Sequence, residues 1–206
     1  MFETTFKAVL THLTNNQTLI NKLWSEIASH YGRRNRHYHN LYHLDSLLSE
    51  LLIIQDKITD WQIIVFSIAY HDIIYNTLKK DNEERSASIA YGRLGLLNIV
   101  THRKEKCREQ ILSSKGHYKS NDSDTNYFTD ADLAILGSNY FRYKKYTEHI
   151  RKEYRMYPDL IYKPGRQKVL HHFLQMPTIY KTDYFIEQYE QQARNNIQYE
   201  LNELEQ

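Results

Sequence analysis

Residues that interrupt regular secondary structure are scarce in this chain, which has only six Gly and three Pro among 206 residues. Turn-rich β proteins need such residues often, so their scarcity favours long helices. Apolar residues recur at helical spacing, and no useful stretch alternates apolar and polar residues as a half-buried strand does. The sequence therefore predicts an all-α fold, a single-domain orthogonal bundle of helices.

Ten helical segments are predicted from this spacing. Asp60 is expected to cap the fourth helix, whose apolar residues nearly encircle it as in a central buried helix. Residues 115–126 are rich in turn-forming residues and predict an exposed loop. No linker or repeat divides the chain, so residues 1–206 are expected to form one domain. The predicted helices cover about residues 3–13, 18–31, 40–55, 61–75, 82–97, 103–114, 131–136, 140–157, 166–174 and 183–204.

The charges nearly balance, with 27 Lys and Arg against 25 Asp and Glu, which disfavours a nucleic-acid partner. The single cysteine, Cys107, excludes an intramolecular disulfide and fits a reducing compartment. Its charged neighbours predict an exposed thiol. We identify no signal peptide, and the strongest apolar run, residues 63–70, is too short to span a bilayer. We therefore expect a cytoplasmic protein with no membrane partner.

Imidazole and carboxylate side chains occur in segments that are otherwise apolar. The His71-Asp72 pair interrupts the apolar stretch 68–75, and unpaired polar groups are costly to bury. Neutral imidazole and ionised carboxylate are natural ligands of a divalent metal ion. A hydrogen-bonded polar network in the core is the structural alternative. The polar residues concerned are His39, His43, His71, Asp72, Asp130 and Asp132.

The order His…His-Asp…Asp in this chain resembles the HD-domain superfamily of metal-dependent phosphohydrolases. The segment Tyr38-His39-Asn40-Leu41-Tyr42-His43 is also similar to the histidine motif of cyclic nucleotide phosphodiesterases. The whole chain resembles a bacterial group of predicted HD phosphohydrolases. The matching stretches are 36–44, 70–75, 82–87, 130–137, 150–154, 165–166 and 193–196.

This resemblance implies roles for individual residues. Asp132 is preferred to Asp130 as a ligand because it is the second acid of an Asp-x-Asp-x-Leu segment, which leaves Asp130 as a helix cap or a hydrogen-bond partner. His39 is implied to be the general acid. Tyr75 stands where the phosphodiesterases carry a further histidine, which weakens a prediction of cyclic nucleotide specificity. The implied metal ligands are His43, His71, Asp72 and Asp132.

The expected chemistry is hydrolysis of a small phosphorylated substrate, such as a nucleotide. A divalent ion (Mn, Mg, Zn, Fe, Co or Ni) lowers the pKa of bound water from ~15.7 toward ~7, so that hydroxide can attack phosphorus. Asp72 is expected to take part at the metal, and His39 can protonate the leaving oxygen with an unperturbed pKa near ~6.5. Phosphate contacts are expected from Arg36, Arg151 and Arg166, for which salt bridges are the alternative.

Two other functions remain open at this point. One is a binding or signalling module that keeps the metal without turnover. The other is a dinuclear oxygenase of the HD type, in which His117 and another histidine would hold iron. His117 otherwise has a predicted role in substrate contact, whereas His102 lies among charges and is predicted to be on the surface. The sequence leaves the substrate, the metal and the oligomeric state open.

Overall fold

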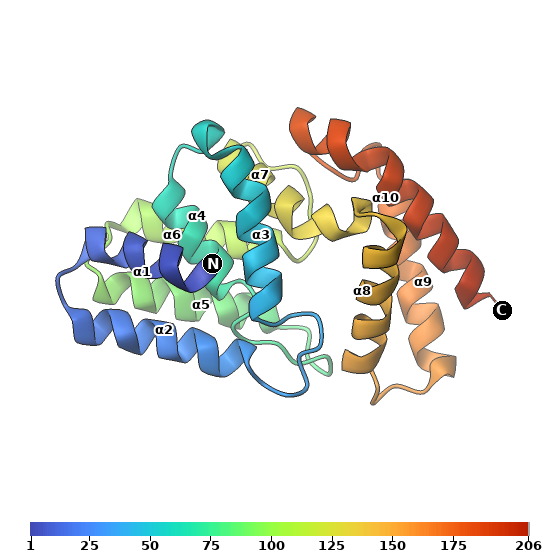
Figure 1. Ribbon diagram of the computed structural model, residues 1–206, viewed down its shortest axis with the longest axis horizontal. Coiled ribbons are helices and arrows are strands. Elements are labelled where there is room, and N and C mark those ends of the chain that lie inside the picture. The colour runs from blue at the N-terminus through green and yellow to red at the C-terminus, as the bar shows by residue number, and fades with distance from the viewer. Residues whose placement is uncertain (206) are drawn as a thin grey trace. The chain divides into compact units, whose positions relative to one another are not determined.

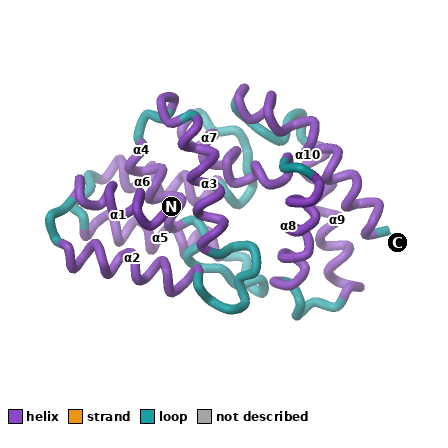
Figure 2. The backbone as a smooth tube through the Cα atoms, viewed as in Figure 1, coloured by secondary structure: helices purple, strands orange, loops and turns teal. Residues whose placement is uncertain are grey.

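The computed structural model describes residues 1–205. These residues form ten α-helices and two short 3-10 helices, and they contain no strand (Figures 1 and 2). The prediction of an all-α protein is confirmed. None of these helices combines the length and the hydropathy that a bilayer-spanning segment requires.

The chain divides into two compact units, unit 1 (Met1–Thr129) and unit 2 (from Asp130 onward). The single-domain prediction stays a prediction.

Unit 1 is built around a short, mostly apolar helix, α4. Every residue of α4 from Ile63 to Tyr70 is buried, and the helix contacts α1, α3, α5 and α6. Asp60 caps it as predicted, because its side chain accepts a hydrogen bond from the backbone N–H of Ile63 at 3.2 Å. The helices of unit 1 are α1 (Phe2–Leu13), α2 (Gln17–Tyr31), α3 (Leu41–Ile53), η1 (Gln55–Lys57), α4 (Trp61–Tyr70), α5 (Asn82–Leu96) and α6 (Thr101–Ser113).

The helix α7 (Ser123–Leu133) begins in unit 1 and runs without a break past the division at Thr129. Its start corrects the predicted loop over residues 115–126. Asp122 accepts a hydrogen bond from the Thr125 N–H at 2.9 Å, so a residue that looks like a turn former caps a helix instead. Asp124 is fully buried and accepts the N–H groups of Thr59 and Asp60, which secures the entry to α4.

Unit 2 contains η2 (Ala134–Gly137), α8 (Tyr140–Glu153), α9 (Asp159–Gln175) and α10 (Asp183–Leu204). The 3-10 helix η2 packs against α10 and α8. Gly137 permits this approach, since a Cβ there would lie 2.5 Å from the Cβ of Tyr189. The helix α9 starts at Asp159, seven residues before the predicted start at residue 166. The predicted start is too late because Pro164 lies inside the helix, and a proline usually marks a helix boundary.

Two further predictions are wrong. The fourth helix ends at Tyr70 rather than near Tyr75, and the chain turns at His71. Cys107 is fully buried rather than exposed, since it shares one face of α6 with Gln110 and Ile111, while α6 packs against α4. Burial raises the pKa of the Cys107 thiol to about 12. The charged residues around Cys107 in the sequence occupy the other faces of the helix.

Candidate metal centre

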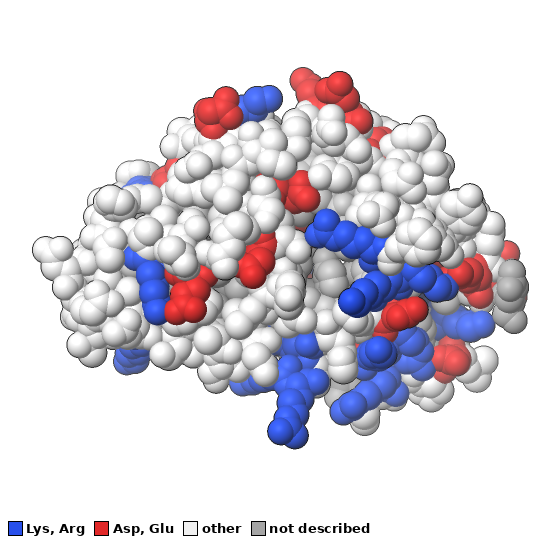
Figure 3. Space-filling model, viewed as in Figure 1, with Lys and Arg blue, Asp and Glu red and all other residues white. Residues whose placement is uncertain are grey.

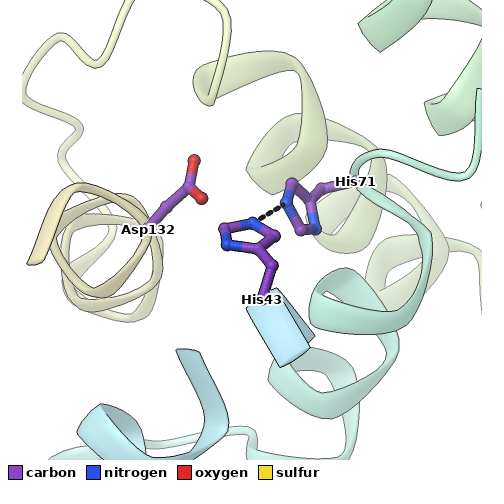
Figure 4. Close-up of side chains that lie close together, drawn as sticks. All are labelled: His43, His71 and Asp132. Atoms are coloured by element: carbon purple, nitrogen blue, oxygen red, sulfur yellow. Dashed lines mark hydrogen bonds between the residues drawn. The ribbon is translucent and has the colours of Figure 1, made fainter. Parts of the chain in front are cut away.

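Three side chains with metal-ligating atoms come together, His43, His71 and Asp132. One nitrogen or oxygen from each lies within 4.8 Å of those from the other two. Figure 4 shows the two imidazole rings facing one another, with the carboxylate of Asp132 turned toward them. Two nitrogens and an oxygen form a donor set suited to zinc and similar divalent ions.

Each of the three residues lies near the end of a helix. His43 is in the first turn of α3, which is capped by the Asn40 side chain accepting from the Tyr42 N–H at 2.8 Å. His71 is the C-cap residue of α4, and its N–H donates to Ser67. Asp132 is in the last turn of α7.

The tautomer of His71 is fixed by the backbone. Its Nδ1 lies 3.0 Å from the carbonyl oxygen of Ile68, which can only accept, so Nδ1 carries the proton. The Nε2 lone pair therefore points into the cluster, where it lies 3.0 Å from Nε2 of His43.

The two histidines are shielded from water, with 5% of His43 and 1% of His71 exposed. A dry imidazole pair strengthens the attraction for a cation, since the local dielectric constant is low. The residues present therefore fit a divalent ion, with His43, His71 and Asp132 as its ligands.

Asp72, the fourth predicted ligand, borders the cluster without belonging to the group of three. Its Oδ2 lies 3.2 Å from Nε2 of His71 and 3.9 Å from Nε2 of His39. Burial raises the pKa of the Asp72 carboxyl, but the imidazoles of His71 and His39, when protonated, outweigh it, so the pKa lies well below its usual range. Asp72 is therefore an ionised carboxylate that contacts both His71, a predicted ligand, and His39, the predicted general acid.

His39 lies in the segment before α3, in an aromatic setting. Its ring is 4.9 Å from that of Tyr38, edge to face, and 4.3 Å from that of Tyr75, measured between centroids. The side chain is 19% exposed, so its ring is held by packing while remaining open to water on part of its surface. That combination suits a group that must meet a substrate in a fixed orientation.

Arg36 is buried, and its guanidinium holds the backbone beside the cluster. It donates to the carbonyl oxygens of Asp72 at 2.7 Å, Ile73 at 3.0 Å and His39 at 3.2 Å. Its carbon Cζ also lies 4.7 Å from the ring centroid of Tyr31. The structure therefore places Arg36 as a positioning residue for the turn that carries the His71-Asp72 pair.

Arg151 and Arg166, both in unit 2, form the salt bridges that were the alternative to phosphate contacts. Arg151 pairs with Asp159 at 2.6 Å. Arg166 is buried and pairs with Glu200, with its Nε 2.7 Å from Oε1, and it also donates to the hydroxyl of Tyr146 at 3.3 Å.

His117 follows α6 and is not one of the three clustered residues. Its φ of 52° places it in the left-handed region, which is uncommon for a residue other than glycine.

Asp130 is buried and accepts the N–H groups of Lys181 and Thr182, which fixes the segment leading into α10. This contact fits the expected role of a hydrogen-bond partner rather than that of a helix cap, because α10 begins only at Asp183.

Sequence reasoning missed two residues that lie near Asp132 within unit 2. Burial raises the pKa of Tyr146. The charge of Arg166 opposes this change, whereas the charges of Glu200 and Asp132 add to it. Burial lowers the pKa of Lys181, while Asp130 and Asp132 oppose the change. No motif marks either residue as a neighbour of the charge on Asp132.

Comparison of the chain with protein-family models, with curated proteins and with solved structures finds no match in any of the three.

Proposed function

We propose that this protein is a metal-dependent phosphohydrolase of the HD type, with His43, His71 and Asp132 as metal ligands and Asp72 completing the shell. One observation carries the proposal. Two buried imidazoles and a carboxylate converge, and the backbone directs one imidazole lone pair into the group. Such a set is expensive to bury without a cation.

The side chains around the cluster fit this reaction class. A bound divalent ion would supply an activated water and neutralise charge on the phosphoryl oxygens. Asp72 is ionised beside the proposed ligand His71 and can orient that water. His39, held between two aromatic rings, is the proposed donor of a proton to the leaving oxygen. The substrate class is a small phosphate ester, for which nucleotides are the first candidates.

The test measures metal content in purified full-length variants. Replacing His43, His71 or Asp132 with Ala should remove bound metal from protein loaded with Mn, Fe, Co, Ni or Zn and then desalted. His102→Ala is the matched control, because His102 is an exposed histidine in the first turn of α6. Metal content unchanged in all three site variants, measured by mass spectrometry, would refute the ligand assignment.

The metal count also separates the competing functions. One ion per chain supports the mononuclear hydrolase, whereas two iron ions per chain would favour the dinuclear oxygenase. The loaded protein is then assayed against p-nitrophenyl phosphate, bis-p-nitrophenyl phosphate, nucleotides and sugar phosphates. Metal binding without turnover on any of these would favour the non-catalytic module.

A further inference from the structure

Unit 2 exposes large aliphatic side chains at the turn between α8 and α9. Met156 is 71% exposed, Leu160 87% and Ile161 58%. We call these three residues the α8–α9 tip. Leu160 and Ile161 lie in the first turn of α9, so their exposure belongs to a formed helix, in which the N–H of Ile161 donates to the carbonyl of Pro158 at 2.9 Å.

The turn beneath the tip is held in one shape by Arg151. Its guanidinium donates to the carbonyl oxygens of Tyr154 and Tyr157, each at 3.1 Å, and to the carboxylate of Asp159 at 2.6 Å. The same guanidinium lies 4.6 Å from the ring centroid of Tyr162. Because these contacts preorganise the turn, docking through the tip loses little conformational entropy.

The charge around the tip is positive. Residues 142–168 contain nine Lys and Arg and three Asp and Glu. Two of these basic residues, Lys144 and Arg166, pair with Glu203 and Glu200 of α10. Near the tip, Lys152, Arg155 and Lys163 form no ion pair with a carboxylate among residues 1–205. Figure 3 shows Lys and Arg side chains gathered over the part of unit 2 where Figure 1 draws α8.

We propose that the α8–α9 tip docks on the surface of an anionic lipid bilayer. Aliphatic side chains at the end of a helix can enter the boundary between head groups and acyl chains, while the basic residues around them remain at the level of the lipid phosphates. This inference goes beyond the hydrolase proposal, and it departs from the sequence-based expectation of no membrane partner.

Two other occupants fit the surface less well. A second copy packed through the same face would bring two basic clusters together, which is unfavourable. Single-stranded nucleic acid would satisfy the basic residues, but it stacks on aromatic rings and would gain little from Met156, Leu160 and Ile161. An anionic bilayer accounts for both the charge and the exposed aliphatic groups.

The experiment measures co-sedimentation of the full chain with vesicles of phosphatidylcholine alone and of phosphatidylcholine with a quarter phosphatidylserine. We expect at least about tenfold stronger binding to the anionic vesicles, falling as salt is raised. The double variants L160S/I161S and K152E/R155E should each weaken that binding at least about tenfold. The control is Phe141→Ser, because Phe141 is 85% exposed at the start of α8, away from the tip in sequence.

Three outcomes would overturn the proposal. The first is equal binding to neutral and anionic vesicles. The second is binding to anionic vesicles that survives both double variants. The third is binding to a single-stranded oligonucleotide that is as tight as vesicle binding and that K152E/R155E alone weakens to the same extent. Circular dichroism of each variant checks that it is folded, which we expect because all the substituted side chains are partly or largely exposed.

Discussion

At the scale of single residues, the sharpest question is whether His39 transfers a proton or binds the metal. Its Nε2 lies 3.9 Å from the Asp72 carboxylate, and it is not among the three clustered ligands. We therefore expect His39→Ala to retain metal while turnover falls by about 10²–10⁴-fold, the usual contribution of a general acid. Metal analysis and a phosphatase assay on the same preparation test this.

The matched control is His37→Ala, two residues earlier in the same segment and also partly exposed. It should keep both metal and turnover. Loss of metal in His39→Ala would make His39 a ligand instead, and unchanged turnover would remove it from the mechanism.

The sequence identifies the residue types of this site better than their partners. His43, His71 and Asp132, which the resemblance implies as ligands, lie together in the structure. The three arginines are different, because a basic residue in a motif segment gives no sign of which acceptor it will meet. Arg36 meets carbonyl oxygens 36 and 37 residues away in the chain, and only the fold creates that contact.

At the scale of secondary structure elements, prediction succeeds where local signals agree with packing. The bounds of α10, Asp183–Leu204, match the predicted 183–204 because its amphipathic pattern is long and uninterrupted. Prediction fails for α4, whose apolar pattern continues to Tyr75 although the helix ends at Tyr70. The turn at His71 depends on hydrogen bonds from Arg36, and periodicity alone contains no trace of that interaction.

The capping of α4 gives a pH-dependent prediction. Burial raises the pKa of the Asp60 carboxyl, but hydrogen bonds from Arg103 and from the Ile63 N–H outweigh it, so the pKa lies below its usual value. The unfolded chain then takes up this proton more readily than the native protein. The stabilising contribution of Asp60 is therefore complete above the unfolded pKa of ~3.9, and it is lost as the pH falls through the lower native value.

We expect Asp60→Asn to lower the free energy of unfolding at pH 7 by roughly 1 kcal/mol, since the Arg103 pair is partly exposed and Asn remains a good cap. The difference from the unaltered protein should shrink below pH ~4. Urea unfolding between pH 7 and pH 3 measures it. Asp56→Asn, at an exposed aspartate in η1, is the control and should show no such trend. A difference that stays constant with pH would contradict the role given to Asp60.

At the scale of the whole molecule, the candidate metal centre joins segments that are far apart in the chain. Its ligands come from α3, from the end of α4 and from α7. A metal that binds this set holds three elements at once, and it binds the folded chain better than the unfolded one, in which no preformed site exists. Metal binding should therefore stabilise the fold as a whole.

The expected size of this effect follows from mass action. A metal at 100 times its dissociation constant adds about 2.7 kcal/mol, which corresponds to a rise in Tm of about 5–10 °C for a chain of this length. Thermal unfolding of protein stripped with a chelator and then reloaded measures it, at a fixed protein concentration. His71→Ala should show no rise with metal, whereas His102→Ala should respond like the unaltered protein. In His71→Ala the imidazole is gone whose lone pair points into the cluster because its Nδ1 bonds the Ile68 carbonyl. An equal rise in Tm in this variant would therefore mean that the stabilising ion binds elsewhere.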